Sequence, residues 1–315
     1  MKKTTIILIV LVVLLIFFTE GLAAPLQKSL VPADAKWVVH LDLQKYTSSR
    51  LHAGLLNHEI MDKLRAKNAE ISTVYGIDPI KDIKSVTVYG LDVKEKETVI
   101  CVDGTFNREK LFDQIRKKAH EAPQEETYHQ NTIYSWDSDK YIVFAKEGPV
   151  IIGMSDKAIK TALDVIARKK QDISASPLKS ELDKAPSDAI LTAAVENISL
   201  LVKHSKPVIL KKMGNALFTL AERQEDLVFD LNIFALTPED AKNMEQIVRG
   251  LIAMANLQKE DIPAELKLPE DLTIQTKGNT VRMGFTYPVE YIIQLIAKKG
   301  SFLRSSFMAE FSPLS

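Results

Sequence analysis

An internal repeat constrains the fold of this chain more than any other feature of its sequence. Residues 85–117 contain two strand-like stretches on either side of the charged turn KEKE, followed by an amphipathic segment that Asn107 can cap as a helix. The same order of hairpin, cap and helix returns at residues 215–250, where Thr237 follows Asn107 by 130 positions. The sequence therefore predicts two copies of one α+β unit.

A second match extends the repeat to the end of each copy. The segment VIIGMSDKAIKTALDVIA from Val150 aligns with VRMGFTYPVEYIIQLIA from Val281 at an offset of 131 positions. The matched glycines, Gly153 and Gly284, predict close backbone packing at the end of a strand in both copies. The predicted fold is α+β, with two tandem repeats that are each an antiparallel sheet with helices packed on one face.

The repeat also sets the expected domain boundaries, because 315 residues exceed what one hydrophobic core usually serves. A polar segment with two prolines near residue 175 separates a first repeat at 24–175 from a second at 176–300. Residues 35–169 and 187–298 are expected to superpose with the same strand order. The tail 301–315 carries several large apolar residues, and it either docks on the body or is disordered.

The N-terminus has the pattern of a secretory signal peptide over residues 1–23. Two lysines precede an apolar run at 6–18, and the small residues Gly21 and Ala23 follow it. Cleavage is predicted after Ala23, because a cut one position later would leave Pro25 first. The apolar run is shorter than the roughly 20 residues of a permanent membrane helix. An uncleaved helix that tethers the protein is the alternative.

Charge and cysteine content narrow the possible partners. Removal of residues 1–23 leaves 39 basic and 40 acidic residues, so the sequence has no electrostatic footprint for nucleic acid. The expected partners are an envelope or extracellular protein or a small molecule, with no stable membrane span after cleavage. The single cysteine, Cys101, lies in a strand pattern and is expected to be a buried free thiol.

Two short segments resemble known proteins. Val31-Pro32-Ala33-Asp34-Ala35 precedes the first expected strand, and Gly76-Ile77-Asp78-Pro79, followed by Asp82-Ile83, precedes the next. These segments are similar to those of secreted bacterial families of unknown function with tandem α+β repeats. The resemblance implies only that exported two-repeat α+β proteins of this type exist without an assigned activity, and it supplies no catalytic residues to transfer. The signal segment gives the expected location, which is the periplasm, the cell surface or the extracellular space.

Four side chains of the first repeat are the best metal or acid–base candidates. His40 and Asp42 share one face of the strand expected at 36–43, because alternate residues of a strand project to the same side. His58 and Asp62 are one helical turn apart, close to the pattern of a zinc protease but with an aspartate where the second histidine would stand. Solvated or packed side chains are the simpler explanation for both pairs.

The common catalytic motifs are missing from the sequence. It contains neither the Gly-x-Ser-x-Gly of serine hydrolases nor a dinucleotide-binding glycine pattern. Residues 148–155 have the glycine spacing of a phosphate-binding loop, but Met154 replaces the lysine that neutralises the phosphates. We therefore predict no cofactor, and whether the protein is an enzyme stays open, with a non-enzyme favoured.

The leading functional hypothesis is an exported, non-catalytic binding or scaffolding protein. A ligand or partner is expected in a cleft between the two copies, since pockets concentrate at domain interfaces. Tyr128, Tyr134 and Trp136 are candidates to line that cleft, with sheet-core packing as the alternative. The rival hypothesis is an exported hydrolase with a site assembled in the first repeat.

Overall fold

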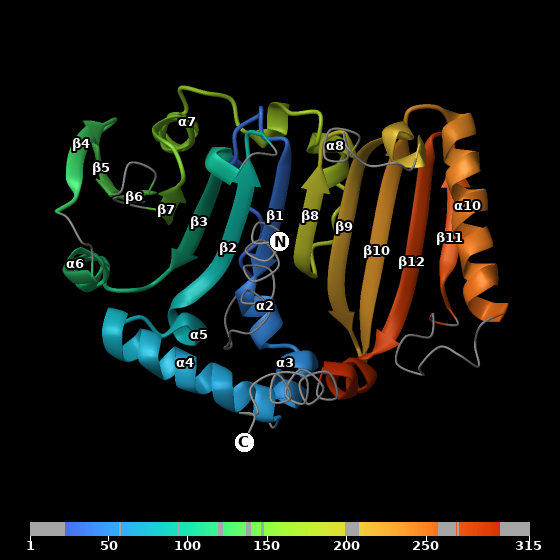
Figure 1. Ribbon diagram of the computed structural model, residues 1–315, viewed down its shortest axis with the longest axis horizontal. Helices are drawn as coiled ribbons and strands as arrows, with labels where there is room; N and C mark the ends of the chain where they lie inside the picture. Colours follow the sequence, from blue (N-terminus) through green and yellow to red (C-terminus); the bar gives the residue numbers. More distant parts are fainter. Residues whose placement is uncertain are drawn as a thin grey trace, which may run out of the picture.

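Within the part of the chain that the structure describes, twelve strands form one continuous antiparallel sheet in the computed structural model (Figure 1). The described residues are 23–56, 58–92, 95–118, 122–136, 140–145, 148–198, 208–257, 269 and 271–296. The predicted signal segment or anchor, up to residue 22, and the predicted tail 301–315 therefore lie outside the described residues.

The strands are listed here in their order across the sheet. From one edge to the other they are β11 (Thr273–Lys277), β12 (Thr280–Pro288), β10 (Asp226–Ala235), β9 (Met213–Arg223), β8 (Ala189–Val195), β1 (Trp37–Asp42), β2 (Ile83–Gly90), β3 (Thr98–Gly104), β7 (Val150–Gly153), β6 (Lys140–Phe144), β5 (Asn131–Trp136) and β4 (Gln124–Tyr128).

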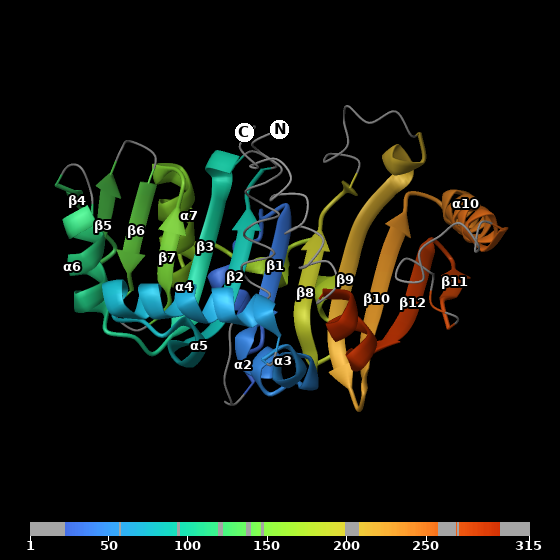
Figure 2. The same ribbon diagram turned by 60° about the horizontal axis from the view of Figure 1, so that its bottom comes forward.

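Helices cover both faces of the sheet (Figure 2). We call the side to which His40 of β1 projects the His40 face, and the opposite side the Leu41 face. The His40 face is covered by η1 (Lys28–Leu30), α7 (Asp156–Ile166), η3 (Ile173–Ala175) and α8 (Lys179–Leu182). The Leu41 face is covered by α2 (Leu43–Thr47), α3 (Arg50–Leu55), α4 (Glu59–Tyr75), α5 (Pro79–Asp82), α6 (Arg108–Lys118), α10 (Pro238–Leu257) and the helical residues 289–296. Short 3-10 turns, η2 (Glu95–Glu97) and η4 (Val208–Lys212), precede β3 and β9.

The α+β class agrees with the sequence prediction, but two features differ from it. The strands form one sheet instead of one per repeat, because β1 and β8 pair antiparallel from Trp37↔Val195 to Leu41↔Leu191. This pairing satisfies backbone groups that two separate sheets would leave at open edges. Helices also lie on both faces, since an apolar stripe along a helix does not specify which face of a sheet the helix covers.

Strand order is similar on the two sides of the β1·β8 pair. Moving outward, one side reads β1, β2, β3, β7, β6 and the other reads β8, β9, β10, β12, β11. The first half then adds β5 and β4 at its edge. The two-repeat arrangement and its domain boundaries stay predictions, with the shared strand order compatible with them.

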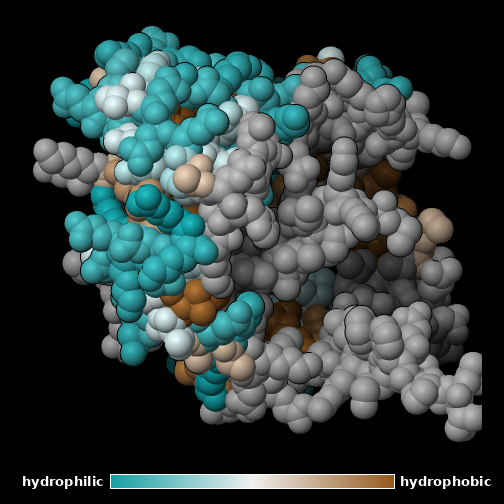
Figure 3. All heavy atoms as spheres, turned by 60° about the vertical axis from the view of Figure 1, so that its left-hand side comes forward, coloured by the Kyte–Doolittle hydropathy of each residue, from teal (hydrophilic) through white to brown (hydrophobic). Residues whose placement is uncertain are grey.

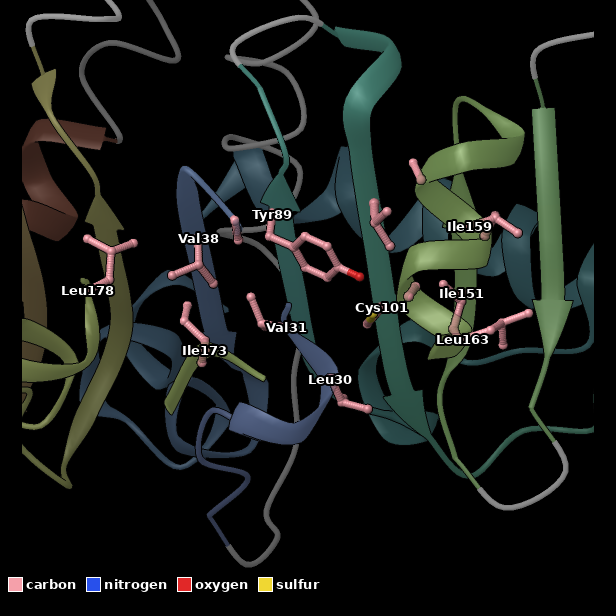
Figure 4. Packing of buried hydrophobic residues seen from close by; sticks show 14 of the residues in the cluster. Leu30, Val31, Val38, Tyr89, Cys101, Ile151, Ile159, Leu163, Ile173 and Leu178 are labelled. Carbon is pink, nitrogen blue, oxygen red and sulfur yellow. The ribbon is translucent and has the colours of Figure 1, made fainter. Parts of the chain in front are cut away.

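The largest core on the His40 face connects the lead segment, the sheet and α7 (Figure 4). Val38 of β1, Ile151 of β7 and Leu163 of α7 are buried in it. Cys101 also lies in this core, and burial raises the pKa of its thiol to about 12. A thiol that stays protonated is a poor nucleophile, which agrees with a packing role.

The two glycines matched by the repeat differ in their surroundings. A Cβ on Gly153 would lie 2.7 Å from Cγ1 of Ile159, a fully buried residue of α7, whereas the nearest atom to a Cβ on Gly284 is Oγ1 of Thr273 at 3.4 Å. Close packing is therefore present at Gly153 and absent at Gly284. We expect Gly153→Ala to lower the free energy of unfolding by about 1–3 kcal/mol through overpacking.

Gly284→Ala is the matched control for this first prediction. It is expected to change the free energy of unfolding by less than about 0.5 kcal/mol, because its new methyl group makes only ordinary contacts. Urea titration of both variants gives the comparison. An equal loss of unfolding free energy in the two variants would contradict the conclusion that only Gly153 is closely packed.

Candidate functional site

His40 and Asp42 lie on β1, in the middle of the sheet, and both are buried. They project to the same face, as the sequence predicts. The cross-strand partner of His40 on β8 is Thr192. The lead segment runs over this face, and Ala24 comes within hydrogen-bond distance of both side chains. The pair therefore meets the backbone of a segment far away in sequence.

The hydrogen bonds of His40 define its protonation. Its Nε2 lies 2.9 Å from the carbonyl oxygen of Ala24, and its Nδ1 lies 2.9 Å from Oγ1 of Thr87. A carbonyl oxygen only accepts, so Nε2 carries the proton and the Thr87 hydroxyl can donate to Nδ1. Burial lowers the pKa of His40, outweighing the bond to Ala24 and the nearby Asp42 carboxylate, which raise it. The imidazole is thus neutral at pH 7.

Asp42 accepts two hydrogen bonds and forms one ion pair. Its carboxylate receives the backbone N–H of Ala24 at 2.9 Å and the backbone N–H of Lys45 at 3.0 Å, the second of which caps α2. The Lys45 ammonium lies 3.1 Å away. The carboxylate is fully buried, and these contacts supply the charge and the donors that a buried carboxylate requires. His40 and Asp42 therefore have structural partners.

The second predicted pair lies elsewhere. His58 precedes α4 in the connection from α3, on the Leu41 face, and its side chain makes no capping hydrogen bond. Asp62 lies within α4, and its side chain is outside the described part of the structure. The sheet therefore separates His58 from the buried His40 and Asp42. Among the described residues, no group of three or more His, Cys, Asp or Glu side chains is placed to hold a metal ion.

The three predicted aromatic residues lie on β4 and β5, at the far edge of the first half. Trp136 and Tyr134 belong to a core on the Leu41 face, where Phe112 of α6 lies 4.1 Å from Tyr134 between ring centroids. These strands are separated from β8 by the rest of the first half, so they do not lie between the copies. In Figure 3, which brings this edge forward, the coloured surface is mostly hydrophilic.

Tyr128 takes part in a polar cluster that the sequence pattern did not indicate. Its hydroxyl donates to Oδ1 of Asp164 at 2.9 Å, and Nε2 of His129 lies 2.8 Å from the same oxygen. The Lys169 ammonium lies 2.9 Å from Nδ1 of His129 and can donate to it when the ring is neutral. This cluster fixes the β4–β5 turn, where His129 has a positive φ, on the end of α7.

A groove of about 750 Å³ lies between the lead segment and the C-terminal end of α7. Its lining includes Gln27, Arg168, Lys169 and Lys170. Two of these cations already have partners, since Lys169 contacts His129 and Lys170 forms an ion pair with Asp34 at 2.8 Å. The groove is therefore polar, and two of its three cations are already engaged by neighbouring side chains.

A smaller groove of about 460 Å³ lies over the second half of the sheet. Its walls include Arg282, whose guanidinium forms a two-point ion pair with Asp230, and Arg223, which pairs in the same way with Asp188 beside it. Paired guanidinium and carboxylate groups neutralise one another. The remaining carboxylate of the groove, Asp271, accepts hydrogen bonds from the backbone N–H and the hydroxyl of Thr286.

Among the described residues, the clearest exposed apolar surface is on α10, the helix at the β11 edge (Figure 1). The apolar residues of this helix, Ile247 and Leu251 among them, have the spacing of one broad seam against a sheet. Instead Ala241 and Met244 are buried, whereas Ile247, Leu251 and Met254 are 45%, 59% and 59% exposed. The helix thus has a second apolar stripe. We call it the outer stripe: Ile247, Gly250, Leu251 and Met254.

Within the described residues, no helix combines the length and the apolar character needed to cross a membrane. No protein-family model matches the chain, and no curated protein sequence matches it. Among solved structures, crystal form III of TP0453 matches with a TM-score of 0.47 and 12% identity, covering 87% of this chain and 99% of that one. Crystal form I matches with a TM-score of 0.46 and 13% identity, over 86% and 99% of the two chains. Likeness at this level supports no conclusion about function.

Proposed function

We propose that this chain is an exported, non-catalytic binding or scaffolding protein that holds a helix of an envelope protein against the outer stripe of α10. The exposure of this stripe carries the proposal. Large apolar side chains that lie together on a surface mark interaction sites more often than isolated ones do. The predicted signal segment and the structural roles of His40 and Asp42 support an exported protein without catalysis.

The spacing of the outer stripe fits a helical partner. Ile247, Gly250, Leu251 and Met254 stand at i, i+3, i+4 and i+7, which places them along one line on the helix surface. A Cβ on Gly250 would meet no atom within 4 Å, so the stripe has a gap between its large side chains. A side chain from a facing helix can enter such a gap, as in knobs-into-holes packing.

The charges of α10 favour a protein partner over an anionic lipid surface. Helices that lie on membranes are usually rich in lysine and arginine on their polar side. In α10 the acidic residues Glu239, Asp240 and Glu245 outnumber the basic residues Lys242 and Arg249. The residues from 250 to the end of the helix are uncharged. A neutral apolar helix face is therefore the best match.

Photo-crosslinking in cells tests this second prediction. A photoreactive residue at Ile247 of the full-length chain is expected to yield one discrete protein adduct in the envelope fraction. Leu251→Lys in the same chain is expected to reduce that adduct about tenfold, which corresponds to about 1.4 kcal/mol of binding. The substitution should leave the stability within about 0.5 kcal/mol, because Leu251 is exposed.

Lys242 provides the matched control, since it is exposed on the same helix and points away from the stripe. A crosslinker there should give no such adduct. Equal adducts from both positions would contradict the docking site. An adduct of twice the chain mass would show self-association, and a lipid adduct would show membrane contact; either would also contradict the proposed partner.

A further inference from the structure

The contacts of Ala24 are unusual for a residue at the start of an extended lead segment. Its N–H donates to Oδ2 of Asp42 at 2.9 Å, and its carbonyl oxygen accepts from Nε2 of His40 at 2.9 Å. Both side chains are more than nine-tenths buried in the centre of the sheet. The preceding residue, Ala23, is exposed. The buried polar pair thus holds the chain at the position where the sequence predicts the end of the signal peptide.

We propose that hydrolysis of the Ala23–Ala24 peptide bond makes Ala24 the first residue of the mature protein, and that its new α-ammonium group forms a buried ion pair with Asp42. This inference rests on export, which is part of the proposed function. A signal-processing endopeptidase adds one water molecule across the bond. The C–N bond breaks, Ala23 leaves with the new carboxylate, and the nitrogen of Ala24 takes up protons to become the ammonium.

The geometry already suits a charged donor. The Ala24 nitrogen is at the distance expected for an N⁺–H···O⁻ bond, and such bonds are roughly twice as strong as neutral ones. The other charged group at this carboxylate is Lys45, whose side chain is 19% exposed and also donates to the carbonyl oxygen of Ser187. His40 is neutral and the facing β2 residues, Ser85 and Thr87, are uncharged. Repulsion of the new ammonium is thus limited to one partly solvated cation.

The choice of bond follows from the same contacts. A cut one residue later would remove Ala24 and with it both hydrogen bonds. A cut one residue earlier would leave the nitrogen of Ala24 as an uncharged amide. Only cleavage between Ala23 and Ala24 places the positive charge beside the buried carboxylate.

Two preparations that differ by one residue test the ion pair. Fusion proteins cut by a specific protease can yield a chain that starts at Ala24 and a chain that starts at Ala23, each with a free α-amino group at that first residue. The Ala24 start is expected to have an equilibrium constant for folding at least tenfold larger in denaturant titrations at pH 7. Asp42→Asn should abolish that difference. Equal stability of the two starts would overturn the ion pair.

A titration readout does not depend on the folding of the Asp42 variant. The α-amino pKa of the Ala24 start is expected to rise above its usual range of about 7.7–8.0, because the ammonium gains a carboxylate partner. The tenfold larger equilibrium constant for folding of the Ala24 start should therefore be fully present below about pH 7. It should disappear as the pH rises through the raised pKa of the α-amino group. Labelling by an amine-reactive reagent measures this pKa, and an unchanged value would overturn the proposal.

Mass spectrometry of the protein recovered from the envelope tests the cleavage itself. A chain that begins at Ala24 supports the proposal. An exported chain that begins at another residue would overturn the proposed cleavage site but would leave the proposal of export intact. A chain that retains its first residues and stays in the cytoplasm would contradict export, and so the proposed function as well.

Discussion

Residues 24–175 and residues 176–315, expressed as separate chains, are each expected to lack a cooperative folding transition. The core on the His40 face joins Val38 of the first segment to Leu178 of the second (Figure 4). Leu217 of the second segment belongs to the same core. Each segment alone would expose its share of this core to water. Circular dichroism during thermal unfolding, together with soluble yield, measures the outcome.

Loss of the β1·β8 pairing further destabilises the separate segments, because it leaves β1 in one segment and β8 in the other as open sheet edges. Such edges carry unpaired backbone groups and promote aggregation. Co-expression of the two segments is the control and should restore a soluble complex. A cooperative transition in either segment alone would contradict the expectation and would support two independent domains.

Trp136→Ala is expected to lower the free energy of unfolding by about 3–5 kcal/mol, the range for loss of a large buried aromatic side chain. Trp136 is 9% exposed and packs with Ile142 and Val150, and its ring centroid lies 6.4 Å from that of Phe112. Urea titration of the purified variant measures the loss.

Trp136→Phe is the matched control. It keeps most of the apolar ring and removes the buried Nε1–H, which has no hydrogen-bond partner among the described residues. The expected loss is below about 1.5 kcal/mol. An alanine variant as stable as the phenylalanine variant would show that the ring is not core, and it would revive the predicted role of Trp136 in binding.

Local features of the fold could be predicted because they depend on neighbouring residues. Asn107 and Thr237 cap α6 and α10 as expected, and Ser155 caps α7 in the same way, each by accepting a backbone N–H three residues later. Gly278 turns the β11–β12 hairpin with a positive φ, as its position between two strand patterns indicates. Side-chain chemistry decides both kinds of feature within four residues.

The sequence pattern does not reveal two other local features, the short helix α5 and the edge strand β4. A residue before proline favours extended backbone, so Asp78-Pro79 fits an extended connection. Instead Asp78 caps the short helix α5 and Pro79 occupies its first turn, a position that proline tolerates. The edge strand β4, with the sequence QEETY, shows no apolar alternation because most of it is exposed. Patterns of burial cannot identify a strand that buries little.

The candidate sites depended on contacts that no local pattern contains. The sequence placed His40 and Asp42 on one face, but their partner Ala24 is 16 and 18 positions away from them. The sequence alone does not distinguish the outer stripe of α10 from a core stripe, because Ile247 is as apolar as a buried residue. Which stripe faces the sheet depends on the packing of the whole helix, which its own pattern does not contain.

Differential scanning calorimetry of the chain that begins at Ala24 tests most directly whether the twelve strands form one folding unit. A continuous sheet with shared cores predicts a single transition, with equal calorimetric and van't Hoff enthalpies. Two resolved transitions, or a calorimetric enthalpy about twice the van't Hoff value, would show that the halves unfold independently and would contradict the joined sheet.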